Sequence, residues 1–245
     1  MKSKYFTVEV KPLLPASIQT AAYAAGEILF DWTAIQIPRG VAKLISLTVL
    51  VRGTNGADQQ GIDMELFFAK TVDSVAPVTL GTTGAAVDTP GWQNHLIGYT
   101  HMDASANAIS SLDDLVFMSM MQMPSRGGAP GILLAGEPNS GDTVGHDTIY
   151  IAGLAQGAYD FRSTVQVSTE TAINTTAVVV KTTSALINFA AGDVLHDEND
   201  LVIGTIKTVT DAENLVLEAD CGAVSAVNKD LYNINPFTFI LGFEK

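Results

Sequence analysis

Alternating apolar and polar positions run along most of the chain and predict β-strands rather than helices. The strands are separated by loops rich in Gly and Pro, most clearly at 74–94 and 125–147. The predicted strands are residues 4–10, 27–37, 41–52, 62–70, 95–102, 115–123, 148–154 and 158–167. Apolar residues at helical spacing are nearly absent. The pattern favours an all-β, antiparallel sandwich or barrel, and long strands joined by long loops suit a jelly roll.

Residues 186–217 follow a different pattern, with shorter strands and a turn at every break. The turns read AAGD, HDEND and DAEN, and the strands between them are rich in Val and Thr. A meander of this size buries little apolar surface by itself. We therefore predict a small β-barrel unit that is carried by a larger β-domain.

The final segment, PFTFILGFEK at 236–245, matches the long apolar strands near the start of the chain better than the meander before it. We predict that this strand returns to the first sheet. On this interpretation residues 1–165 plus 234–245 form a jelly-roll-like sandwich, and residues 166–233 form a small β-barrel domain inserted before the last strand. The alternative is two domains in tandem, with the final strand in the second.

The composition and charge of the chain indicate which classes of binding partner to expect. The chain is 47% hydrophobic and 16% charged, with a formal net charge of −13 and no basic run, which argues against a nucleic-acid surface. No stretch approaches the roughly 20 apolar residues that span a bilayer. The N-terminal residues also lack the apolar core of a signal peptide. We expect no membrane partner and no classical secretion, with the extra apolar surface buried in a well-packed core or against other subunits.

Four acidic residues gather around the HDEND turn: Asp193, Asp197, Glu198 and Asp200. They lack the alternating Asp/Asn pattern, the central Gly and the closing Glu of a calcium loop. Paired carboxylates for glycoside hydrolysis need a cleft that raises the pKa of one of them. We expect instead an exposed, solvated hairpin tip.

The other reactive side chains form no recognisable motif. The histidines, which have no diagnostic ligand spacing, are His95, His101, His146 and His196. His95 and His101 fall in one predicted strand and would share a face. Cys221 is the single cysteine, so it forms no intrachain disulfide, and we expect a half-buried small residue. Ser125 and Ser140 lie in Gly-rich loops without the Gly-x-Ser-x-Gly of a nucleophile elbow.

The remaining candidates are the methionines and the isolated aromatic side chains. The Met-rich group, which we expect in the core, consists of Met102, Met118, Met120, Met121 and Met123. The isolated aromatics, too few to indicate a carbohydrate platform, are Trp32, Trp92, Tyr99 and Tyr150. We therefore predict no catalytic residues, no cofactor-binding residues and no metal ligands, and a protein that is not an enzyme.

Two stretches resemble virion structural proteins of tailed bacteriophages, especially those of marine cyanobacterial phages. One contains KYFTVEVKPLLPAS, AAGEILFDWTAIQIPRGVAKLISLTVLVRG and ELFFAKT, and is similar to the N-terminal β-sandwich of such proteins. The other, AGDVLHDENDLVIGTIKTVTDAENLVLE, is similar to a small-barrel unit that recurs in phage head and tail proteins. The resemblance implies an assembly role without enzymatic activity.

Within that class we favour a head decoration, or cement, protein. The resemblance implies a homo-oligomer, taken here as a trimer, made in the host cytoplasm and bound to the major capsid protein lattice on the outer capsid surface. Residues 1–25 are the candidate contact segment, and their alternative role is simply the first strand of the sandwich. The competing classes are a tail, collar or fibre-attachment protein, and a carbohydrate-binding jelly roll for host adhesion with Trp92 exposed in a groove.

Overall fold

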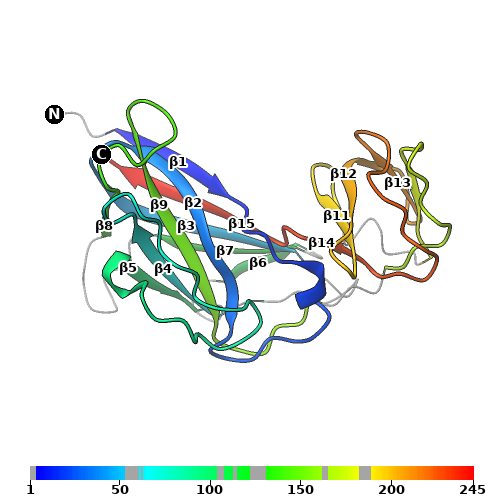
Figure 1. The fold of residues 1–245 in the computed structure, drawn as a ribbon, viewed down its shortest axis with the longest axis horizontal. Coiled ribbons are helices and arrows are strands. Elements are labelled where there is room, and N and C mark those ends of the chain that lie inside the picture. The colour runs from blue at the N-terminus through cyan, green and yellow to red at the C-terminus, as the bar shows by residue number, and fades with distance from the viewer. Residues whose placement is uncertain are drawn as a thin grey trace.

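The computed structural model describes residues 4–52, 61, 63–103, 108–112, 115–121, 131–161, 165–181 and 189–245. These residues form an all-β fold of three antiparallel sheets (Figure 1). Their helical content is two 3₁₀ turns, η1 (Ala16–Ile18) and η2 (Gln93–His95). No helix in this part of the chain has the length and hydropathy needed to cross a bilayer.

The first two sheets pack together, and we call them the sandwich. The six-stranded sheet consists of β1 (Tyr5–Val10), β15 (Phe237–Glu244), β3 (Val41–Arg52), β7 (Leu115–Met121) and β6 (Ala108–Leu112), with β8 (Ile132–Ala135) also paired to β3. The four-stranded sheet consists of β2 (Ile28–Pro38), β9 (His146–Ala155), β4 (Met64–Lys70) and β5 (Leu96–Met102).

The third sheet lies at the opposite end of the molecule from the chain ends marked in Figure 1. It consists of β10 (Ala177–Val179), β13 (Asn214–Leu217), β12 (Val202–Val209), β11 (Val194–Asp197) and β14 (Leu231–Asn233). We call residues 166–233, which carry this sheet, the small unit.

The last strand lies inside the sandwich. β15 pairs antiparallel with both β1 and β3, so that Phe239 stands opposite Val10 on one side and Val49 on the other. The prediction that PFTFILGFEK returns to the first sheet is therefore confirmed, and β15 is not part of the third sheet. After β9 the chain leaves the sandwich and forms β10 to β14 of the small unit. It then returns to the six-stranded sheet as β15, which lies between β1 and β3.

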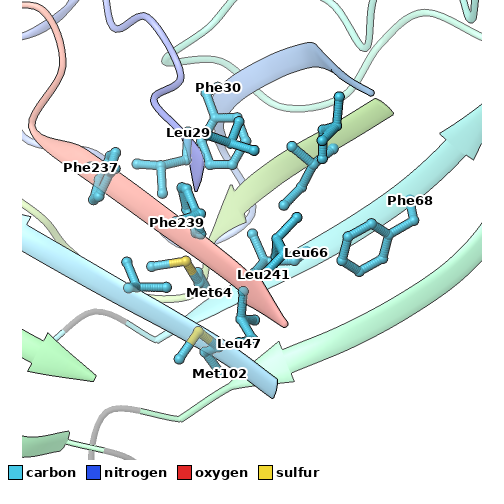
Figure 2. Packing of buried hydrophobic residues seen from close by; sticks show 14 of the residues in the cluster. Leu29, Phe30, Leu47, Met64, Leu66, Phe68, Met102, Phe237, Phe239 and Leu241 are labelled. Atoms are coloured by element: carbon cyan, nitrogen blue, oxygen red, sulfur yellow. The ribbon is translucent and has the colours of Figure 1, made fainter. Parts of the chain in front are cut away.

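The core of the sandwich explains why β15 pairs there. The side chains of Phe237, Phe239, Leu241 and Phe243 are buried while the residues between them face outward, apart from the small Gly242. Phe239 packs against Phe30 of β2, with 5.2 Å between ring centroids. Figure 2 shows these rings meeting Leu and Met side chains from both sheets. Burial of each such ring contributes about 1.5–3 kcal/mol, which outweighs the intrinsic strand preference of any single residue.

The small unit has a second core that shares no residue with the first. Leu195, Ile203, Ile206, Leu215 and Leu217 are among its buried members. The side chains come from short strands in which apolar and polar positions alternate, so each strand contributes one or two of them. The small unit thus carries its own hydrophobic stabilisation.

Residues 165–168 run between the two edges of the third sheet. On one side Val167 N donates to Lys229 O at 2.9 Å, and Leu231 N of β14 donates to Val165 O at 2.9 Å. On the other side Ser168 N donates to Val179 O of β10 at 2.8 Å. The segment therefore satisfies backbone groups at both edges of the sheet, which would otherwise be open to pairing with another chain.

One predicted strand is wrong. Residues 158–161 form no strand, and the rest of the predicted range 158–167 includes 162–164, outside the described residues. Tyr159 makes an isolated bridge with Tyr23, and Phe161 packs edge-on against the Tyr23 ring at 5.9 Å. The alternation here arises because Tyr159 and Phe161 point into the sandwich core, without a ladder of backbone pairing. Residues 13–25 form no α-helix and no strand, and consist of η1, turns and irregular chain with one bridge at Tyr23.

Candidate functional site

The acidic turn is not the solvated tip that the sequence predicted. The side chains of Asp193 and Asp197 are buried, with residue exposures of 6% and 3%. Asp197 organises the turn itself, since one of its carboxylate oxygens accepts hydrogen bonds from Asn199 N at 2.9 Å and Leu201 N at 3.1 Å. Glu198 forms an ion pair with Lys229. The carboxylates are buried because backbone donors and a cation replace the water they would lose.

Two acidic residues of this region reach across to the sandwich, and we call this contact the junction. Asp193 pairs with Arg52 at the end of β3. Asp200, held at a φ of +62°, accepts a hydrogen bond from Ser17 N at 3.2 Å and another from the Ser17 hydroxyl. The acidic turn therefore faces the sandwich and fastens the small unit to it.

Residues 11–19 complete the junction from the sandwich side. Leu14 N donates to Ile234 O at 2.8 Å. The Gln19 amide, which is 2% exposed, donates to Leu14 O at 2.8 Å and to Asn233 O at 3.2 Å. A buried amide with two carbonyl acceptors fixes the path of the chain into β15, because an unsatisfied donor there would cost about 1–3 kcal/mol. Part of the segment predicted as a capsid-contacting arm thus lies against the small unit.

Burial and charge act in opposite directions on Asp193. Burial raises the pKa of its carboxyl above the usual value, and the cations Arg52 and Lys11 partly offset that rise. The carboxylate is consequently costly to keep ionised unless Arg52 stays in place.

Replacing Arg52 with alanine should weaken the junction by about 1–2 kcal/mol at neutral pH, because a buried carboxylate loses its partner. This destabilisation requires the ionised form of Asp193. The difference in stability between the wild type and Arg52→Ala should therefore disappear as the pH falls through the raised pKa of the Asp193 carboxyl in the folded state. Urea unfolding of the small unit, followed by amide hydrogen exchange of β11 and β12, measures it at neutral and acid pH.

The matched control is the same substitution in an Asp193→Asn background, which has no carboxylate to lose a partner. There Arg52→Ala should change stability little at either pH, as a double-mutant cycle requires for a specific pair. An equal loss in both backgrounds would show that Arg52 acts through its aliphatic stem or through β3 instead.

The four histidines lie in different environments. His95 ends η2 and its Nδ1 lies 2.9 Å from Lys70 O, so it does not share a strand with His101 as predicted. His101 stands on β5 opposite Glu65. His146 Nδ1 lies 3.0 Å from Thr143 Oγ1. Burial lowers the pKa of His196, which is in the small unit. Among the described residues no three His, Cys, Asp or Glu side chains are grouped to hold a metal ion.

Both tryptophans are anchored in a small cluster beside β2. Trp32 Nε1 donates to Val78 O at 2.9 Å, and Trp92 Nε1 donates to Thr89 O at 2.7 Å. Their rings pack against a buried group that includes Ile28 and Leu80. Trp92 is therefore half-buried against this cluster, which is not the arrangement expected of a carbohydrate platform. Sequence reasoning missed this role because the contacting residues lie in a loop without periodicity.

The remaining candidates have structural surroundings. Cys221 is buried in the second core, and burial raises the pKa of its thiol. Ser140 Oγ donates to Glu137 O at 2.6 Å and accepts from Thr148 N at 2.9 Å, which closes the 136–146 loop. Met102 is buried in the sandwich core, as predicted. Tyr99 is exposed and donates to Glu65 at 2.9 Å, and Tyr150 is half-buried.

Some predictions fall on residues that the structure does not describe. They concern Ser125, Met123 and the side chains of Met118, Met120 and Met121. Of the candidates named from the sequence, Asp193 and Asp200 lie at the junction, where their contacts hold the small unit against the sandwich.

Comparisons with protein-family models, with curated proteins and with solved structures find no match to this chain.

Proposed function

We propose that the chain is a non-enzymatic virion structural protein of a tailed bacteriophage, and specifically a head decoration protein. The observation that carries this proposal is the central position of β15, the strand that follows the small unit. A unit inserted before an interior strand is joined to the sandwich through both of its ends, so the chain carries the two units together. In this proposal the sandwich anchors the protein, and the small unit is displayed from it.

The proposal includes a finer description of the fold. Residues 1–165 plus 234–245 are a jelly-roll-like sandwich, and residues 166–233 are a small β-barrel domain. Support for the barrel comes from residues 165–168, whose hydrogen bonds to Val179 and Lys229 link the two edges of the third sheet. Support for the sandwich comes from its two antiparallel sheets and their crossed order, in which sequence neighbours rarely pair.

The proposed partner is the major capsid protein lattice on the outer surface of the head. Ten acidic and three basic side chains fall within residues 166–233, so the small unit carries much of the net charge of −13. An acidic unit facing outward keeps particles apart by mutual repulsion. The protein would act as a homo-oligomer, taken as a trimer, with no nucleic acid, membrane, cofactor or metal partner.

Two other roles compete with decoration of the head. A tail, collar or fibre-attachment protein would use the same architecture but occupy a ring or an axial position in the particle. A carbohydrate-binding jelly roll for host adhesion is favoured less, because the rings of Trp32 and Trp92 are partly buried against the cluster that contains Ile28 and Leu80.

Deletion of the gene tests the proposal in the phage itself. Mutant particles should still package DNA, and they should lose infectivity faster than wild-type particles under heat or osmotic shock, because the shell lacks its bridging contacts. Complementation with the intact gene is the control. Particles of normal shell stability that lack tails or fibres would contradict the decoration role.

A further inference from the structure

One corner of the sandwich combines exposed apolar side chains with cations. Tyr5, Glu244, Lys43 and Leu133 stand side by side in register across β1, β15, β3 and β8. Val41 lies two residues before Lys43 on the same face of β3. The side chains of Tyr5, Val41 and Leu133 are between 57% and 68% exposed. In a register of this kind the four strands present one continuous face.

The same corner gathers four of the thirteen cations of the chain, which are Lys4, Arg39, Lys43 and Lys245. Lys4 and Lys245 are joined through their backbones by hydrogen bonds of 3.0 and 2.9 Å, and the Lys245 ammonium donates to Arg39 O. Lys43 lies 4.0 Å from Glu244, the one acidic residue of the row. We call the three apolar side chains and these four cations the basic corner.

The small unit presents the complementary surface. Ile173, Val202 and Val224 are between 48% and 54% exposed. They belong to adjoining segments, since Thr171 Oγ1 donates to Ala223 O at 3.0 Å and Gly222 N donates to Ile203 O at 2.8 Å.

Two exposed acidic residues adjoin these segments in the chain. Glu170 precedes the 171–175 turn, and Asp220 precedes the 221–225 segment that packs on it. We call Ile173, Val202, Val224, Glu170 and Asp220 the acidic patch.

We propose that copies of this chain associate head to tail, with the basic corner of one copy bound to the acidic patch of the next. Both surfaces have exposed apolar side chains with charged groups around them. In the basic corner the four cations outnumber their carboxylate partners, which are Glu244 beside Lys43 and Asp147 at 3.7 Å from Arg39, so the net charges of the two surfaces are of opposite sign. The two surfaces lie at opposite ends of the molecule (Figure 1), so one copy cannot satisfy both by folding on itself. Contact between copies removes apolar surface from water, and the paired charges fix its orientation.

Such a contact is heterologous, because it joins two different surfaces. It generates rings when the rotation between copies closes, and open chains when it does not. The inference does not depend on the virion proposal, since it concerns purified copies of this chain alone. It goes beyond that proposal by naming the surfaces through which copies would join.

Two double variants, each with substitutions at exposed positions, test the head-to-tail association. The corner variant combines Lys43→Glu with Leu133→Glu, and the patch variant combines Asp220→Lys with Val224→Lys. Sedimentation velocity of the wild-type chain should show association that increases with concentration. Each variant alone should associate at least about tenfold more weakly, because charge and apolar contact are both removed. Tryptophan fluorescence checks that each variant keeps the wild-type sandwich.

Mixing the two variants is the decisive step. The corner variant keeps an intact acidic patch and the patch variant keeps an intact basic corner, so the mixture should form one-to-one pairs that neither protein forms alone. Lys207→Glu, an exposed change in β12 outside both surfaces, should associate as the wild type does. A monomeric wild-type chain, a patch variant that still associates, or a mixture without pairs would each overturn the proposal.

Discussion

Replacement of Phe239 with alanine should lower the free energy of unfolding of the sandwich by about 3–5 kcal/mol. The ring is fully buried in the central strand β15 and packs against Phe30 at 5.2 Å and Phe237 at 6.1 Å. Its loss removes apolar burial and leaves a cavity that strands on both sides cannot close. Urea unfolding followed by tryptophan fluorescence measures the effect, since both tryptophans of the chain, Trp32 and Trp92, are in the sandwich.

The neighbouring residue supplies the control. Ile240 lies on the outer face of the same strand and is only partly buried. Ile240→Ala should therefore cost about 1 kcal/mol, through lost strand preference and a small loss of burial. Equal effects of the two substitutions would mean that β15 does not face the core as the register requires.

Replacement of Leu195 with alanine should destabilise the small unit by about 2–5 kcal/mol. Leu195 is fully buried in the second core and shares no cluster with the sandwich residues. Amide hydrogen exchange of β12 and β13 should accelerate accordingly. The tryptophan-detected transition of the sandwich should keep its midpoint, because the two cores meet only through the junction in the described part of the chain.

The two substitutions should have separate effects. Phe239→Ala should change only the tryptophan-detected unfolding transition, and Leu195→Ala should change only the hydrogen exchange of β12 and β13. Phe239→Ala should leave the exchange of β12 and β13 unchanged in the absence of urea. A shift of both probes by either variant would show that the sandwich and the small unit unfold as one cooperative body.

Local pattern predicted the strands and the position of β15 well. Phe237, Phe239 and Leu241 alternate with outward-facing residues, and this period of two identifies a half-buried strand wherever it lies in the chain. The length and apolar character of the segment matched it to β3. Its pairing partners are far away in sequence, but strands of similar length and hydrophobicity are the ones that bury one another.

The junction was beyond the reach of such reasoning. The sequence separation is 141 residues between Arg52 and Asp193, and 183 residues between Ser17 and Asp200. Charged residues at a turn are ordinarily solvated, so the HDEND segment indicated an exposed tip. Its burial depends on donors and cations from another sheet, and nothing in the local pattern reports where a distant cation will be placed.

The strand predicted around Tyr159 and Phe161 was wrong for a related reason. Period-two burial predicts a strand only when a neighbouring backbone is present to pair with it. There the two rings bury themselves against the sandwich core, and pairing is limited to one bridge with Tyr23. Side-chain packing alone had produced the sequence pattern of a sheet.

The position of the protein in intact particles tests the central claim most directly. Electron cryomicroscopy of virions that carry this chain should reveal many copies on the outer surface of the head, with the sandwich against the shell lattice and the small unit directed outward. Loss of this density from particles of the deletion mutant would identify it. Density confined to the tail, the collar or the fibres, with none on the head, would contradict the account.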